Sequence, residues 1–241
     1  MNVTSIEGVA SLIGEAGRIH ILTALLDGNS HSAAELALAA GVSAQTASSH
    51  LAKLVEGGLI VSERKGRQRF FRFKSTDVAV AVEALGALVQ KPTFVQKQPI
   101  PAMPELRLAR TCYDHLAGVL AIALRNELLR KDILRHREDE FLLTATGERF
   151  LSSLDIDVES LRNQRRSFAR KCMDWTERHH HVGGAVGAAL LGRFLENKWL
   201  ARIRGTRAVR VTHEGQRVFE RLFAIRCSAL QSQLAIHNTA K

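Results

Sequence analysis

The four prolines of this chain lie close together, near the middle of its 241 residues. They are Pro92, Pro99, Pro101 and Pro104, all within the stretch KPTFVQKQPIPAMP. Proline lacks a backbone N–H and biases the residue before it toward extended conformations, so neither a helix nor an inner strand is expected to run through this stretch. Residues 91–104 are therefore predicted to connect two folded domains, residues 1–90 and residues 105–241.

The composition of the chain indicates helices and an anionic partner. Hydrophobic residues make up 46% of the chain but aromatic residues only 5%, a balance that favours helices over a β-sandwich. The formal net charge is +10. Residues 1–90 contain 8 basic and 8 acidic residues, whereas residues 91–241 contain 26 and 16, so the excess lies in the second half. A polyanion or an anionic surface is the expected partner.

Cysteine usage and the N-terminal residues predict a cytoplasmic protein. Three cysteines, an odd number in a chain this long, do not make a disulfide framework and fit a reducing compartment. The first residues contain Glu7 and Glu15 and no basic segment, unlike a secretory signal. No apolar stretch reaches the roughly 18 residues that a membrane span needs, so no membrane partner is expected.

Three predicted helices follow one another in the first domain. The segment EAGRIHILTALLDG has apolar residues at helical spacing and ends at Gly28. A second helix begins with a capping box formed by Ser32 and Glu35 and ends at Gly41. The third helix has Ser43 as its N-cap and stops at a pair of glycines. Two short helices joined by a glycine-containing turn predict a helix-turn-helix.

A basic β-hairpin is predicted after these helices. The stretch LIVSERKGRQRFFRF alternates apolar and polar residues on both sides of Lys65–Gly66. This stretch contains several basic residues and only one acidic residue, Glu63. A domain without net charge therefore still has a basic edge suited to phosphates or the minor groove. The order of helices and hairpin predicts a winged helix-turn-helix.

The third helix and the hairpin are predicted to contact double-stranded DNA. Gln, Ser, Thr and Lys side chains hydrogen-bond with base edges in the major groove, while hydroxyls and backbone amides hold phosphates. The predicted DNA-binding residues are Ser43, Ala44, Gln45, Thr46, Ser48, Ser49, His50, Lys53, Arg64, Lys65, Arg67 and Arg69. The alternative is that these are ordinary solvated charges on a structural helix pair and hairpin.

Residues from about Ser11 to Phe73 resemble the ArsR/SmtB family of winged-helix repressors. The matching pieces are GRIHILTALL, the motif AAELALAAGVSAQTASSHLAKLVEGGLIVSERKGRQRFFRF and the SxHLxxLxxxGLI pattern inside it. The resemblance implies a homodimer assembled through the helices that flank the motif. It also implies that the dimer binds a twofold-symmetric operator and usually represses transcription until an effector arrives. The remaining two thirds of the chain are an extension that small members of the family lack.

The metal sites typical of that family are missing from the matching positions. The family's Cys-x-Cys site corresponds to Ser32 and Ala34, and neither residue replaces a thiolate ligand. The other family site uses carboxylates and histidine after the wing, where this chain offers only Asp77 and Glu83. No metal or other cofactor is predicted from these patterns. Sensing, where it occurs, is expected in the second domain.

The second domain is predicted to contain an internal duplication, with repeats at about 108–157 and 168–225. The pattern R-x-C-x-D begins at Arg110 and again at Arg170, and each copy precedes an apolar helix and the pattern x-T-x-x-G-x-R-x-F. Such repeats usually pack about a pseudo-twofold axis. Long helices are expected over Val158–Arg178 and Glu214–His237. The domain is thus predicted to be helical and winged-helix-like, within a mainly α protein that has small β-hairpin wings.

The candidate effector-binding residues lie in and near the R-x-C-x-D copies. They are Cys112, His115, Cys172, Trp175 and His179, with the whole run His179-His180-His181 as potential ligands. Cys112 and His115 are predicted to share one helix face, as are Cys172 and His179. Four interpretations of these residues are possible: a packing and ion-pair motif, an effector pocket without metal, a Cys₂His₂ metal site, and a redox-sensing thiol pair.

The predicted function is a sequence-specific DNA-binding transcriptional regulator, a homodimeric repressor released by an effector in the second domain. One alternative is an architectural DNA-binding protein without an effector, in which the basic second half adds DNA contacts. The other is an enzyme with a winged-helix appendage. The chain is not predicted to be an enzyme, because the sequence contains no P-loop, no nucleophile elbow and no H-E-x-x-H motif.

Overall fold

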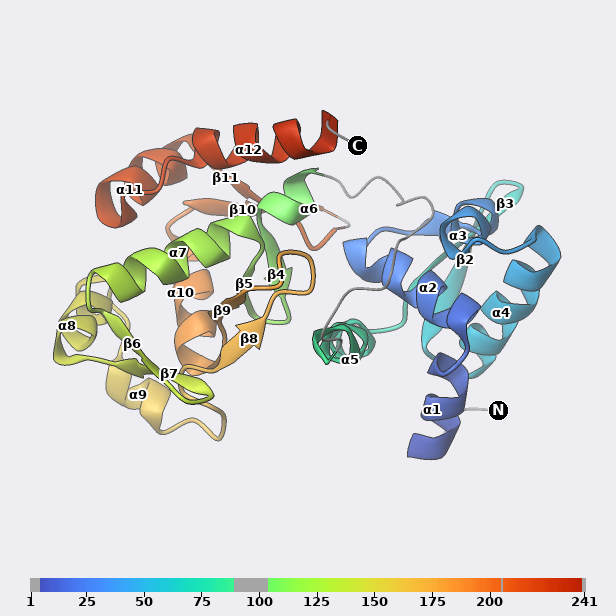
Figure 1. The fold of residues 1–241 in the computed structure, drawn as a ribbon, viewed down its shortest axis with the longest axis horizontal. Helices are drawn as coiled ribbons and strands as arrows, with labels where there is room; N and C mark the ends of the chain where they lie inside the picture. Colours follow the sequence, from blue (N-terminus) through green and yellow to red (C-terminus); the bar gives the residue numbers. More distant parts are fainter. Residues whose placement is uncertain (1–4, 89–103, 205, 240–241) are drawn as a thin grey trace. The chain divides into compact units, whose positions relative to one another are not determined.

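Residues 5–88, 104–204 and 206–239 are described in a computed structural model of the chain (Figure 1). The chain divides into two compact units, Met1–Ala102 and Met103–Lys241, here called the N-terminal and C-terminal units. The predicted connector, residues 91–104, lies outside the described residues except for Pro104, which begins a helix.

The N-terminal unit is a winged helix-turn-helix, as predicted. Its elements are α1 (Ile6–Ile13), α2 (Ala16–Ala24), the 3₁₀ helix η1 (Leu25–Asp27), β1 (His31–Ser32), α3 (Ala33–Ala40), α4 (Ala44–Glu56), β2 (Ile60–Lys65), β3 (Gln68–Phe73) and α5 (Thr76–Ala87). Helices α2, α3 and α4 pack on one another around a core of Ile21, Leu22, Leu36 and Leu51. This core holds α4 against the rest of the unit, which leaves its other face to solvent.

Side-chain caps set the limits of the helix-turn-helix. The Ser32 hydroxyl accepts a hydrogen bond from the Glu35 N–H, and the Glu35 carboxylate accepts one from the Ser32 N–H, so the capping box is confirmed. Gly41 ends α3 with φ +66°, a left-handed conformation that glycine adopts without strain. The Ser43 hydroxyl then accepts from the Thr46 N–H and starts α4.

The wing is an antiparallel hairpin whose register runs from Ile60↔Phe73 to Lys65↔Gln68. Its turn consists of Gly66 and Arg67, one residue later than the predicted tip. A third strand, β1, pairs with β3 to give the sheet order β1-β3-β2. Strand β1 was not predicted, because two residues beside a helix N-cap have no detectable period.

The C-terminal unit has the same succession of elements twice over. It contains α6 (Pro104–Leu108), β4 (Arg110–Cys112), β5 (His115–Ala117), α7 (Val119–Arg130), β6 (Leu134–Arg137), β7 (Glu140–Leu143), α8 (Ala145–Ser153), α9 (Val158–Arg162), β8 (Lys171–Met173), β9 (His180–Val182), α10 (Gly184–Glu196), β10 (Leu200–Arg202), β11 (Val209–Val211), α11 (His213–Phe223) and α12 (Cys227–Thr239). We call β4–α8 the first repeat and β8–α11 the second. Each runs hairpin, helix, hairpin, helix.

The two repeats pair with each other reciprocally. Arg110, at the start of β4, forms an antiparallel bridge with Ala208 of the second repeat. Arg170, just before β8, forms the corresponding bridge with Glu140 of the first repeat. Each repeat therefore completes the later hairpin of the other, and one continuous core forms between them, including Leu124, Phe194 and Phe219.

The shared T-x-x-G pattern has a structural cause. Thr144 and Thr212 cap α8 and α11, and their hydroxyls accept hydrogen bonds from the N–H groups of Gly147 and Gly215. A Cβ on Gly147 would lie 2.2 Å from the Ile133 carbonyl oxygen, and a Cβ on Gly215 would lie 2.0 Å from the Trp199 oxygen. Only glycine fits where these helices begin against the backbone just before β6 and β10.

Four expectations for the C-terminal unit were wrong. Cys112 and His115 lie on the two strands of a hairpin, not on one helix. Cys172 and His179 do not share a helix either, because Cys172 lies on β8 and His179 in the turn before β9. The expected helix Val158–Arg178 is only α9, which ends at Arg162, and a strand follows. The expected helix Glu214–His237 is broken at Ala224, which has φ +55° and separates α11 from α12.

Within the described residues, no single helix is long and apolar enough to cross a membrane. The helical segments Ile6–Ile13 and Ala16–Asp27 are long and apolar enough only when taken together, and the chain bends by 88° between them.

Candidate nucleic-acid interface and buried cysteine-histidine cluster

Helix α4 presents a polar face to solvent. Ala47, Leu51 and Leu54 are buried on its inner side. The predicted contact residues exposed along the outer side are Ser43, Ala44, Gln45, Thr46, Ser48, Ser49 and Lys53. A helix with a polar outer face and an apolar inner face, held after a tight turn, has the shape that enters a major groove.

Local hydrogen bonds occupy part of this polar face. The Ser48 hydroxyl donates to the Ala44 carbonyl at 2.9 Å, and the Ser43 and Thr46 hydroxyls lie 2.9 Å apart. Within the part of the chain that the structure describes, the side chains of Gln45, Ser49 and Lys53 form no such bond. These three side chains are therefore the ones most available for base edges and phosphates.

His50, one of the predicted contact residues, lies mostly inside the unit. Its side chain is 12% exposed, and its Nε2 atom lies 3.3 Å from a carboxylate oxygen of Glu15, the N-cap of α2. A Cβ on Gly17 would lie 2.8 Å from the same nitrogen, so the ring packs closely against α2. This contact keeps the imidazole largely away from solvent and connects α4 to α2.

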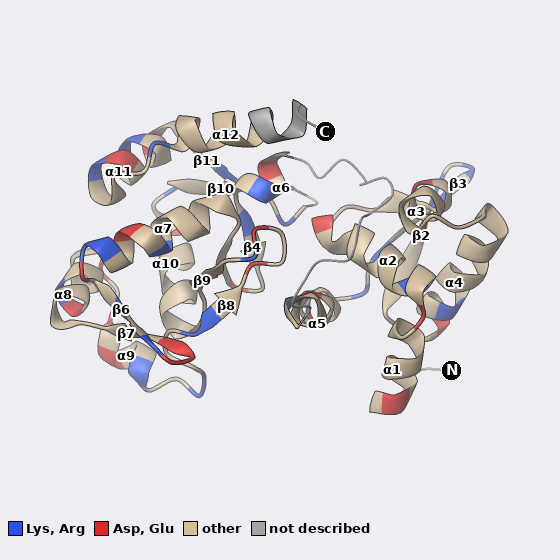
Figure 2. Cartoon of the chain, in the orientation of Figure 1, with Lys and Arg blue, Asp and Glu red and all other residues tan. Residues whose placement is uncertain are grey.

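The wing adds a basic tip beside this helix. Arg64, Lys65 and Arg67 are exposed, and none of them forms an ion pair within the described residues. Figure 2 shows the cationic loop that joins β2 to β3. Lys65 lies over the Phe70 ring at 5.4 Å, which orients it along the strand. Arg69, also a predicted DNA contact, already donates a hydrogen bond to the Ser62 hydroxyl at 2.8 Å.

A second group of polar residues is buried in the C-terminal unit, where two hairpins meet. Cys112 pairs with His115 across β4–β5, and Cys172 pairs with His181 across β8–β9. The four side-chain ligand atoms lie within 4.8 Å of one another. The two Sγ atoms are 4.0 Å apart and the two Nε2 atoms 3.2 Å apart. We call these four residues the Cys/His cluster.

The Cys/His cluster includes three of the five predicted effector residues and omits two. His179 is exposed outside the strand, whereas His181, two residues later, is 1% exposed and faces Cys172 across the hairpin. Trp175 stacks with Arg110, whose guanidinium carbon is 5.4 Å from the ring centroid. The run of three histidines pointed to this region, but its strand register could not be read from spacing.

Two carboxylates lie behind the imidazoles. His115 Nδ1 is 3.3 Å from Asp114 Oδ1, and His181 Nδ1 is 3.5 Å from Asp174 Oδ2. Burial alone would raise the pKa of Asp174, but His181 and Arg110 hold it far below the usual range. Burial would lower the pKa of His181, yet Asp174 and Cys112 favour the charged ring and raise it. Both imidazoles thus present Nε2 to the centre of the cluster.

Asp174 is fully buried and connects the two repeats. It accepts hydrogen bonds from the Arg110 guanidinium at 2.8 Å and from the Gly118 N–H at 2.7 Å, both in the first repeat. It also caps its own turn by accepting from the N–H groups of Thr176 and Glu177. The R-x-C-x-D motif is therefore in part an ion-pair motif, formed between Arg110 of one copy and Asp174 of the other.

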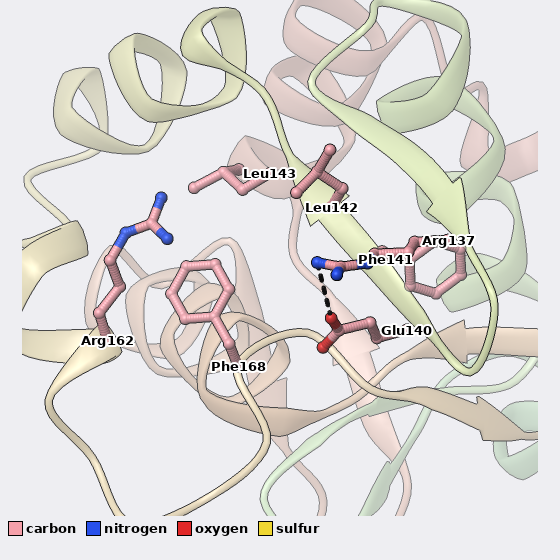
Figure 3. A pocket seen from close by; sticks show the side chains of 7 residues that line it. All are labelled: Arg137, Glu140, Phe141, Leu142, Leu143, Arg162 and Phe168. Carbon is pink, nitrogen blue, oxygen red and sulfur yellow. Dashed lines mark ion pairs between the residues drawn. The ribbon is translucent and has the colours of Figure 1, made fainter.

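A surface pocket of about 270 Å³ lies elsewhere in the C-terminal unit (Figure 3). It is lined by Arg137, Glu140, Phe141, Leu142, Leu143, Arg162 and Phe168. Its arginines already have acidic partners, since Arg137 pairs with Glu140 and Arg162 with Glu148. None of the predicted effector residues lines it.

The helix-turn-helix and basic wing together define a winged-helix DNA-binding protein. The model of the MarR family matches residues 16–69, within the segment that resembles ArsR/SmtB repressors. The HTH-type transcriptional regulator YdfF of Bacillus subtilis (strain 168) is 42% identical over 217 residues, which cover 90% of this chain and 96% of that protein. The chain belongs to this family of HTH-type transcriptional regulators, and the predicted regulatory function is confirmed.

Solved structures with similarity to this chain match about one third of it. Reduced HlyU from Vibrio cholerae N16961 is 29% identical, with 35% of this chain and 88% of that chain covered and a TM-score of 0.33. The homodimeric winged helix-turn-helix domain of Mb0332 from Mycobacterium bovis is 28% identical, with 33% and 73% covered and a TM-score of 0.32.

Proposed function

We propose that this transcriptional regulator is a homodimeric repressor that binds a twofold-symmetric operator through α4 and the wing. The observation that supports it most directly is the outer face of α4 beside Arg64, Lys65 and Arg67, which are exposed and form no ion pair within the described residues. Base edges would be read by Gln45 and Ser49. A regulatory rather than catalytic role agrees with the regulator that matches nearly the whole chain.

Selection of bound duplexes from a random DNA pool tests this proposal. The full-length chain is expected to enrich a symmetric sequence with half-sites one helical turn, about 10 base pairs, apart. Recovery of long, weakly specific duplexes would instead support the architectural alternative.

Replacing Gln45 and Ser49 together by alanine is expected to abolish the preference for the selected sequence. Each lost base contact removes roughly 1–3 kcal/mol of discrimination, so specific affinity falls about 30-fold or more while affinity for random DNA is kept. Competitive gel shifts against random duplex measure this ratio. Ser48→Ala is the matched control, because that hydroxyl is bonded to Ala44. An unchanged preference in the double variant contradicts the assignment.

The flanking helices supply the proposed dimer surface. Helix α1 is apolar, with Ile6, Val9, Leu12 and Ile13 among its eight residues, yet none of them is buried. Ile6 is 85% exposed and Leu88, at the end of α5, is 77% exposed. A second copy of this unit would cover both.

Charged substitutions on these helices are expected to separate the dimer. Replacing Ile6 and Leu88 by lysine removes two apolar contacts worth roughly 1.5–3 kcal/mol each, which weakens association about 100-fold or more. Light scattering over a concentration series measures the mass. Leu38→Lys on α3, where Leu38 is 61% exposed, is the control and should remain dimeric. A monomeric wild type at all concentrations would remove the dimer from the proposal.

The C-terminal unit is the proposed site of effector action. It has its own core, and the predicted DNA contacts all lie in the other unit. A ligand that favours one dimer geometry by about 2–3 kcal/mol would change operator occupancy some 30- to 150-fold. Ligands that raise the melting temperature of the full chain are then tested for loss of operator binding.

A further inference from the structure

The Cys/His cluster has the spacing of a tetrahedral metal site. Four ligands around zinc, with Zn–S near 2.3 Å and Zn–N near 2.0 Å, place two sulfurs about 3.8 Å apart and two nitrogens about 3.3 Å apart. The corresponding separations here are 4.0 Å for the two Sγ atoms and 3.2 Å for the two Nε2 atoms. One thiol and one imidazole come from each repeat, on strands adjacent in a hairpin.

The imidazoles distinguish a metal site from a disulfide or from simple packing. A disulfide between Cys112 and Cys172 requires no histidine, whereas here both Nε2 atoms converge on the same point as the sulfurs. A buried pair of small hydrophobic thiols would equally need no polar neighbours. Room for an ion comes from Gly183, where a Cβ would lie 3.2 Å from His115 Nε2 and 3.3 Å from the Cys172 Cβ.

The surroundings also match those of bound zinc. Metal-binding histidines usually direct their second nitrogen to a carboxylate or a carbonyl, which fixes the ring. Asp114 and Asp174 lie 3.3 and 3.5 Å from the Nδ1 atoms of His115 and His181. Two thiolates, two neutral imidazoles and one divalent cation have no net charge, which suits a site where His115 is 2% and His181 1% exposed.

We propose that Cys112, His115, Cys172 and His181 bind one zinc ion and thereby join the two repeats. All four positions of the tetrahedron are filled by protein, which is the arrangement of structural zinc sites. Soft thiolate and imidazole ligands in this geometry select zinc over magnesium or calcium. Binding would stabilise the folded C-terminal unit, because unfolding separates the ligands.

Metal analysis of the full-length chain tests the proposal. The protein is made without an affinity tag, purified without chelator and analysed by inductively coupled plasma mass spectrometry. About one zinc ion per chain is expected in the wild type, and much less in Cys112→Ser and His181→Ala. The matched controls are Cys227→Ser and His179→Ala, because neither residue belongs to the cluster, and burial raises the pKa of the Cys227 thiol to about 11. Both should keep their zinc.

A spectroscopic variant keeps the test valid where loss of a ligand unfolds the unit. Protein made in cobalt-supplemented medium should show the visible absorption of tetrahedral Co²⁺ and a thiolate charge-transfer band. Cys172→His keeps four ligands and should retain the ion with about half of that band, because one of two thiolates remains. A wild type that takes up no zinc from excess Zn²⁺, or ligand variants that keep full zinc content, would overturn the proposal. Neither experiment measures DNA binding. A negative result for zinc would therefore leave the proposed operator recognition unaffected.

Discussion

Replacing Asp174 by alanine is expected to lower the free energy of unfolding of the C-terminal unit by about 3–5 kcal/mol, the range for breaking a buried ion pair. The substitution leaves the Arg110 guanidinium, whose side chain is 2% exposed, without its carboxylate. It also removes the acceptor for the Gly118 N–H. Urea denaturation followed by tryptophan fluorescence measures this loss, because both tryptophans of the chain, Trp175 and Trp199, lie in that unit.

Two further variants separate the causes of this loss. Asp174→Asn keeps an oxygen acceptor but not the charge, and should lose less than the alanine variant. Glu148→Ala breaks the exposed pair with Arg162, in which both side chains are about half exposed, and should cost about 0.5 kcal/mol or less. Equal losses of unfolding free energy in Asp174→Ala and Glu148→Ala would show that the buried ion pair stabilises the unit no more than the exposed one.

Reversing two charges at the wing tip, Arg64→Glu with Arg67→Glu, is expected to weaken binding to any duplex roughly 10- to 100-fold. Neither side chain has an ion pair within the described part of the chain, so phosphates are the partners they would meet. Two lost phosphate contacts should also reduce the slope of log affinity against log salt by about 2. Fluorescence anisotropy of labelled duplex at several salt concentrations gives both quantities.

The matched control reverses Arg165 and Arg202, two exposed residues of the C-terminal unit, and changes the total charge equally. Its binding and salt slope should stay near the wild-type values. A comparable loss in this control would mean that net charge, or the basic C-terminal unit itself, dominates DNA affinity.

The helix-turn-helix was predictable because its signals are local. The Ser32 and Ser43 caps and the Gly41 stop act on residues within one helical turn, and all three behave as predicted. The hairpin pairs six residues on each strand across a short glycine-containing turn, which is also a local arrangement. The inward orientation of His50 could not be predicted in the same way, because it depends on Glu15 and Gly17 of another helix.

The Cys/His cluster was only partly predictable, because its strands are three residues long. So short an element has no period of its own and is set by its partner strand. The chain between Cys172 and His181 is six residues longer than the chain between Cys112 and His115. Asp174 closes this longer turn through its own hydrogen bonds. The helix spacing assumed for Cys172 and His179 was therefore wrong, because the segment folds as a hairpin that places His181 opposite Cys172.

The reciprocal bridges between the repeats have a consequence for how the C-terminal unit can be divided. Arg110 and Arg170 each complete a hairpin that belongs to the other copy. In a repeat by itself, backbone groups at the edge of the later hairpin would lack their hydrogen-bond partners. A chain cut between residues 157 and 168 should therefore recover its structure only when both fragments are mixed. Two halves of one gene product would then behave as an obligate heterodimer, with refolding that depends on fragment concentration.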